Sequence, residues 1–175
     1  MKNALVIVLC AILLGLSSCH EQPQSSTTKV SNSQLKESLE KANRYLTSDE
    51  EEDIQNYVRR HQWEMVATGT GVLYQIVKTG NGPLIQPGQV VTMEYVLNDL
   101  YGDVVYSSDS DGVIKFVVGH GGVVAGVDEA VRHLHQGDIA HVVVPSHLGY
   151  GLLGDQKKVP SRATLIYTLN IIEVH

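Results

Sequence analysis

Tyr150 stands between Gly149 and Gly151, ahead of a polar stretch and an apolar run that ends at Tyr167. Loops that only connect strands rarely place a large aromatic ring between two glycines. Glycine lets the backbone turn sharply, and a tyrosine hydroxyl can form hydrogen bonds. We therefore take Tyr150 as a candidate for contact with a ligand.

Other residue types that could do chemistry lack the partners that the chemistry needs. The chain has eight histidines, of which His133 and His135 are the closest pair, but helical residues two apart do not share a face. No cluster of carboxylates or cysteines completes a metal-ligand set. Ser146-His147 lacks a nucleophile-elbow context, and the glycine loop 119–122 is not followed by Lys-Ser/Thr. We expect no metal site, no cofactor and no nucleophilic serine.

The charge of the chain argues against a nucleic-acid partner. It carries 13 Lys and Arg against 19 Asp and Glu, a formal net charge of −6. Basic residues stand side by side only at Arg59-Arg60 and Lys157-Lys158, so we expect no basic surface for a phosphate backbone.

The N-terminal residues 1–18 have the pattern of an export signal. Lys2 supplies a positive start, and the apolar run Ala4–Leu16 is shorter than the ~20 residues that a membrane-spanning helix needs. The run ends in Leu-Ser-Ser-Cys, which resembles the lipobox of bacterial lipoproteins and implies lipidation of Cys19. An ordinary secretory signal, or an uncleaved anchor, remains the alternative.

The lipobox resemblance also sets expectations for location. Cys10 would leave with the signal and Cys19 would carry lipid, so no thiol remains for a disulfide. Residues 19–33 would form the lipidated cysteine and a polar, flexible tether. His20, in place of an aspartate, favours the outer membrane under a sorting rule that differs between bacteria. We expect a chain exported and lipid-anchored to the bacterial cell envelope, on the periplasmic face of the outer membrane.

Residues 34–67 are expected to form a helical hairpin. Ser48-Asp49-Glu50-Glu51 has the capping-box pattern that would begin a second helix, with a solvated acidic first turn. A hairpin of this size does not fold alone, so it would pack on the next domain, on a partner, or in a homodimer through residues 34–66. In its first helix, apolar residues recur at helical spacing, at Leu35, Leu39, Ala42 and Leu46.

The spacing of the apolar residues changes after Gly71, and residues 68–175 are predicted to form an α+β domain. The stretch 124–138 has a helical pattern. We expect an antiparallel sheet of five or six strands covering this one short helix. The stretches rich in branched and aromatic residues and bounded by turns are 72–78, 90–97, 113–118, 139–144 and 163–174.

Motifs in this region follow the order and spacing of a known family. They are GVDEAV (126–131), GD (137–138), VPSHLGYG (144–151), VP (159–160) and ATL (163–165). Across roughly residues 70–175 the chain resembles the FKBP-type peptidyl-prolyl isomerases. With its lipobox and the predicted helical segment 34–67, it further resembles lipoprotein isomerases associated with gliding motility in some bacteria.

The resemblance implies a twisted antiparallel sheet wrapped on one helix, with a hydrophobic cup between them that receives the substrate proline. Plain core packing is the alternative role for each aliphatic residue of this cup. Carried over residue by residue, the cup would be lined by Tyr95, Val105, Ile114, Val123, Val124, Val127, Tyr150, Val159 and Tyr167.

The implied activity is cis–trans isomerisation of X–Pro bonds in unfolded or folding envelope proteins. An apolar cup disfavours the planar, polar amide relative to its twisted transition state, and needs no nucleophile, metal or cofactor. The Tyr150 hydroxyl would bind the substrate carbonyl.

Two departures from the family pattern touch this cup. Val105 and Tyr106 stand where members commonly have an aromatic residue and an aspartate, and Val127 stands where many have tryptophan. These changes predict a wider, shallower cup and weaker catalysis. They keep open an alternative function, a proline-segment-binding module or chaperone with negligible catalysis.

Overall fold

The computed structural model describes residues 31–175. The predicted signal segment 1–18, Cys19 and tether residues 20–30 lie outside the described residues. The compact unit that carries the candidate site runs from Glu40 to His175. No helix among residues 31–175 is long and apolar enough to span a membrane.

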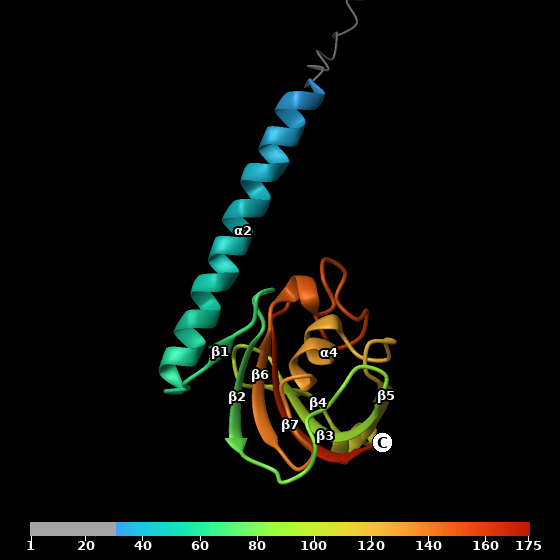
Figure 1. Cartoon of the computed structure of the whole chain (residues 1–175). Coiled ribbons are helices and arrows are strands. Elements are labelled where there is room, and N and C mark those ends of the chain that lie inside the picture. The colour runs from blue at the N-terminus through green and yellow to red at the C-terminus, as the bar shows by residue number, and fades with distance from the viewer. Residues whose placement is uncertain (1–30) are drawn as a thin grey trace, which may run out of the picture. The chain divides into compact units, whose positions relative to one another are not determined.

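Seven antiparallel strands form one sheet, in the order β1-β2-β6-β7-β3-β4, and β5 pairs with β3 beside β4 (Figure 1). All five predicted strands are present, so the predicted antiparallel α+β fold is confirmed. The two additional strands are β1 and β4, which are short. The strands are β1 (Val66–Ala67), β2 (Leu73–Lys78), β3 (Val90–Asn98), β4 (Val104–Ser107), β5 (Ile114–Val117), β6 (Ile139–Val144) and β7 (Leu165–Val174).

The predicted helix at 124–138 is α4 (Ala125–Val131), which packs against one face of the sheet (Figure 1). It ends earlier than its pattern predicts because the following turn is held by a buried carboxylate. The Oδ1 of Asp138 accepts the Gly80 N–H at 2.6 Å, and its Oδ2 accepts the His135 N–H at 2.7 Å. Two short turns of helix, α3 (Ser108–Asp111) and η1 (Ser146–Leu148), complete the domain.

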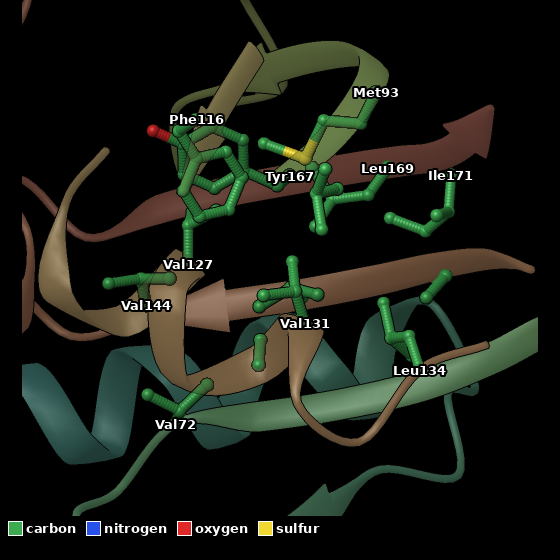
Figure 2. Close-up of a cluster of buried hydrophobic side chains, with 14 of the residues drawn as sticks. Val72, Met93, Phe116, Val127, Val131, Leu134, Val144, Tyr167, Leu169 and Ile171 are labelled. Atoms are coloured by element: carbon green, nitrogen blue, oxygen red, sulfur yellow. The ribbon is translucent and has the colours of Figure 1, made fainter. Parts of the chain in front are cut away.

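The hydrophobic core lies between α4 and this face of the sheet. Figure 2 shows Val127 of α4 facing the side chains of Phe116 and Tyr167, which come from β5 and β7. Successive residues of a strand point to opposite faces, and in β6 Val142 and Val144 therefore belong to this core while Val143 does not.

The opposite face of the sheet is also covered. A second buried cluster joins Ile54 and Tyr57 of helix α2 to apolar residues of three strands. The Trp63 ring, just beyond this helix, stacks on His141 with centres 4.2 Å apart. Burial on both faces explains why β6 ends in the unbroken apolar run Val142–Val144. The strand residues in this cluster are Leu73, Val143 and Ile166.

The predicted helical hairpin is wrong, because α2 is a single helix from Asn32 to Arg60. The capping box that begins it is Ser31 with Gln34: the Ser31 Oγ accepts the Gln34 N–H, and the Gln34 Oε1 accepts the Ser31 N–H, both at 3.2 Å. Ser48 and Glu51, which match the same pattern, lie inside the helix. Their neighbour Glu50 is not a solvated first-turn residue but contacts the domain, as described below.

Candidate active site

Tyr150 follows η1 in a tight turn that the flanking glycines permit. Gly151 has φ +63°, a left-handed conformation that favours glycine. A Cβ on Gly149 would lie 2.9 Å from the Leu165 Cδ1, which is too close for an ordinary side chain. The turn is closed by the Gly151 N–H, which donates to the Ser146 carbonyl oxygen at 2.9 Å. The Tyr150 side chain stays 38% exposed.

An open pocket of about 350 Å³ lies beside this ring. Its wall is polar and apolar in about equal parts, and two tyrosines predicted for the site, Tyr95 and Tyr106, share it with Tyr150. No described residue forms a hydrogen bond with the Tyr150 hydroxyl, so this group is available to a ligand. The remaining lining residues are Asp111, Asp155 and Lys157.

The other predicted site residues lie deeper, in or against the main core. Val127, Val159 and Tyr167 are buried, and Tyr167 stands 6.4 Å from Tyr95 between ring centres. Phe116 belongs to the same cluster and was missed from sequence, where it reads as one more apolar strand residue. The structure thus brings the predicted set together, and the role of each member in binding stays a prediction. The partly buried members packed on this core are Tyr95, Val105, Tyr106, Ile114, Val123 and Val124.

Tyr106 is held by two charged residues from the loop that follows Tyr150. Its hydroxyl donates a hydrogen bond to the Asp155 Oδ2, and the Lys158 Nζ lies 4.7 Å from its ring centre. The Lys158 Nζ also donates to the Val105 carbonyl oxygen at 3.2 Å. Neither charged residue was predicted, because no local motif marks a loop residue that pairs with a strand 49 positions away.

The carboxylate of Asp155 also orders its own loop. Its Oδ1 accepts the backbone N–H groups of Lys157 at 2.9 Å and Val159 at 2.8 Å. Burial alone would raise the pKa of Asp155, but hydrogen bonds from Tyr106 and from these N–H groups together lower it. Asp155 is therefore ionised at neutral pH.

The tyrosines of the pocket are neutral donors at neutral pH. Burial raises the pKa of Tyr150, and the nearby Asp155 raises it further. Burial, followed by Asp111 and Tyr150, raises the pKa of Tyr95. The hydrogen bond to Asp155 is the main cause that raises the pKa of Tyr106 to about 12. The Tyr150 hydroxyl can therefore donate to a carbonyl oxygen.

The histidines have other roles in the described part of the chain. Within residues 31–175 no group of three or more His, Cys, Asp or Glu side chains is placed to hold a metal ion. His133 stacks on Tyr74 with ring centres 5.0 Å apart, and His141 stacks on Trp63. The His135 Nδ1 lies 3.6 Å from the Asp138 Oδ2.

A second hollow, of about 300 Å³, lies between α2 and the turn before η1. Its walls include Ile54, Leu73 and Pro145, and it contains none of the residues predicted for the cup. It offers no tyrosine hydroxyl to a ligand. We therefore place the candidate site at Tyr150.

Part of this chain is similar to known proteins. FK506-binding protein 1 of Gibberella zeae is 32% identical over 109 residues, which cover 59% of this chain and 98% of that protein. The probable FKBP-type peptidyl-prolyl cis-trans isomerase FkpA of Neisseria meningitidis is 31% identical over 108 residues, 61% of this chain and 39% of that protein. The matched segment spans only 22% and 27% of two fungal proteins named FK506-binding protein 4.

Solved structures share the fold. A peptidyl-prolyl cis-trans isomerase from Pseudomonas syringae pv. tomato superposes with a TM-score of 0.64 at 19% identity, covering 75% of this chain and 94% of that one. The family model described as FKBP-type peptidyl-prolyl cis-trans isomerase matches residues 82–172. This segment contains β3 to β6, most of β7, α4 and Tyr150, and the chain belongs to the FKBP-type peptidyl-prolyl cis-trans isomerase family.

Proposed function

We propose that this chain catalyses cis–trans isomerisation of X–Pro bonds at the Tyr150 pocket. The observation that carries the proposal is the Tyr150 hydroxyl, which is neutral, partly exposed and unpaired among the described residues. It stands beside a pocket whose other two tyrosines, Tyr95 and Tyr106, pack against the apolar core. That core contains Val127, Val159 and Tyr167.

The physical argument concerns the amide bond itself. Rotation about it has a barrier of ~18–20 kcal/mol because the C–N bond has partial double-bond character. The twisted amide has lost this resonance and carries less charge on oxygen, so apolar surroundings disfavour it less than the planar amide. Apolar contacts at the proline ring would therefore lower the barrier, while the Tyr150 hydroxyl would hold the carbonyl oxygen in place.

The substrates follow from the N-terminal prediction. With Cys19 lipidated, the domain would act on X–Pro segments of unfolded or folding envelope proteins, at the periplasmic face of the outer membrane. A part in gliding motility is proposed on the same resemblance. Palmitate labelling of the wild type and of Cys19→Ala tests the anchor: label that persists in the variant contradicts it.

A homodimer is proposed through the first part of α2. Leu35 and Leu39 are 50% and 61% exposed, and Leu46 is 39% exposed. Apolar residues at this spacing on a helix suit a helix–helix contact. Light scattering on the full chain tests it: Leu35→Glu with Leu39→Glu should halve the mass, and a wild-type monomer contradicts it.

A second candidate function is binding of proline segments with negligible catalysis. The observation that favours it is Tyr106, whose hydroxyl is engaged by Asp155 in place of the family's aspartate. Such a module would bind a peptide without favouring the twisted amide.

One experiment separates the two functions. The rate of isomerisation of short X–Pro peptides is measured with the full chain, with Tyr150→Phe and with the control Tyr101→Phe, which removes a hydroxyl from a side chain that is 93% exposed. Catalysis predicts a rate enhancement that falls several-fold in Tyr150→Phe and is unchanged in the control. Peptide binding without any enhancement would establish the binding module instead.

A further inference from the structure

Glu50 of α2 forms three hydrogen bonds with residues far away in the sequence. Its Oε1 accepts the Ser146 N–H at 2.6 Å and the Thr164 hydroxyl at 2.8 Å. Its Oε2 accepts the Ser146 hydroxyl at 2.9 Å. The two partners lie 96 and 114 positions from Glu50, so a single carboxylate joins two distant segments of the domain.

These two segments are the ends of the loop 145–164, here called the Tyr150 loop. Ser146 begins η1, and its carbonyl oxygen accepts the N–H groups of Gly149 at 3.1 Å and Gly151 at 2.9 Å, on either side of Tyr150. Thr164 is the last residue before β7. The carboxylate of Glu50 therefore holds both ends of the Tyr150 loop.

The contact is too buried for water to replace it easily. Ser146 is 7% exposed and Thr164 is 3% exposed. Hydrogen bonds to a charged group are stronger than neutral ones, and a buried donor left without an acceptor costs free energy. Removing the carboxylate would leave these donors to find new partners, and the ends of the loop would shift.

Attachment of α2 to the sheet has separate anchors. Ile54 and Tyr57 pack on the sheet, and Trp63 stacks on His141. None of these residues contacts the Tyr150 loop by a hydrogen bond in the described part of the chain. The helix can thus stay in place while the bonds made by Glu50 are lost.

We propose that Glu50 is a positioning residue for catalysis: through Ser146 and Thr164 it fixes the loop that presents the Tyr150 hydroxyl. This inference rests on the proposed isomerase function. It gives α2 an indirect part in catalysis, although the helix lies outside the residues that match the family model.

The test compares Glu50→Ala and Glu50→Gln with the control Glu52→Ala, which removes the same charge from an exposed position of α2. In the full chain, kcat/KM should fall about tenfold in Glu50→Ala, equivalent to about 1.4 kcal/mol of transition-state stabilisation. Glu50→Gln keeps one acceptor oxygen and should recover part of the loss. The control should match the wild type.

Two further measurements distinguish positioning from loss of structure. Hydrogen exchange of the Gly149 and Gly151 amides should accelerate in Glu50→Ala, while fluorescence of Trp63, the single tryptophan, stays unchanged. Unchanged exchange, unchanged kcat/KM or a shifted Trp63 emission would each overturn the proposal.

If Glu50→Ala fails to fold, Thr164→Val removes one hydroxyl at nearly constant shape. It should accelerate exchange at Gly151 and lower kcat/KM several-fold, and wild-type values for both overturn the proposal. A wild-type chain without isomerase activity would refute the proposed function, and the exchange comparison would still decide whether Glu50 positions the loop.

Discussion

The hydroxyl of Tyr106 donates a hydrogen bond to the Oδ2 of Asp155, a residue of the Tyr150 loop. The resemblance to the family implies an aspartate at the position of Tyr106, and in this chain a carboxylate from the Tyr150 loop, that of Asp155, lines the same pocket as Tyr106. Asp155 also accepts two backbone N–H groups of its own loop. The pair therefore ties β4 to the loop that carries Tyr150.

Replacing Asp155 by Asn should lower the pKa of Tyr106 from about 12 toward its ordinary value of about 10. The carboxylate is the main cause of the shift, because it accepts the phenol proton and opposes its loss. Absorbance near 295 nm, compared between each protein and its Tyr106→Phe partner, isolates this one tyrosine among eight. An unchanged titration curve would show that the two groups are not bonded in solution.

Acid should loosen the Tyr150 loop. The folded pKa of Asp155 is lowered, so its stabilising effect is complete above the unfolded pKa of about 3.9 and is lost as pH falls through the folded value. Exchange of the Lys157 and Val159 amides, corrected for its intrinsic pH dependence, should lose protection over that range. In Asp155→Asn the same amides should show no such step, and a step that persists there would assign it to another group.

Restoring the family's aspartate by Tyr106→Asp should lower activity, because it places a second carboxylate opposite Asp155. Two neighbouring carboxylates repel each other, and one of them is forced to bind a proton. Combining Tyr106→Asp with Asp155→Asn should recover kcat/KM several-fold over the single variant. Higher activity in Tyr106→Asp alone would mean that the Tyr106–Asp155 pair limits catalysis.

The elements that local pattern determines were predictable from sequence. Alternation and turn residues placed β2, β3, β5, β6 and β7, and the glycines around Tyr150 have the tight turn that their positions require. β4 was missed because it has only four residues and a register shift. Such a short strand is defined by its pairing with β3 and not by its own pattern.

Residues whose role depends on tertiary contacts were not predictable. The Ser48-to-Glu51 pattern indicates a helix start, but Glu50 lies in mid-helix with Ser146 and Thr164 as its partners. The role of Glu50 follows from contacts across the fold that no local signal contains. Asp155 was missed for the same reason, since its partner Tyr106 is fixed by the sheet.

Gly126→Ala should destabilise the protein by about 1–3 kcal/mol, the usual cost of overpacking a core. A Cβ there would lie 2.3 Å from the Val144 Cγ1, so α4 would have to move away from β6 and take the buried Val127 with it. The matched control is Gly69→Ala, where a Cβ meets nothing within 4 Å. Thermal unfolding measures the stability of both variants. Equal unfolding midpoints for Gly126→Ala and Gly69→Ala would show that α4 and β6 are less closely packed than in this structure.

The stack of Trp63 on His141 should weaken in mild acid. Burial lowers the pKa of His141, and the neighbouring His61 lowers it further. The unfolded chain therefore binds a proton more readily, so the stabilising effect of the neutral ring is complete above about pH 6.5 and is lost as pH falls through the folded pKa. Trp63 emission should shift to longer wavelength as the pH falls below about 6.5 and through the lowered pKa of His141. His141→Gln should abolish the shift, and the control His120→Gln, at an exposed position, should keep it. If the wild-type emission does not change with pH, protonation of His141 leaves the stack of Trp63 on His141 intact.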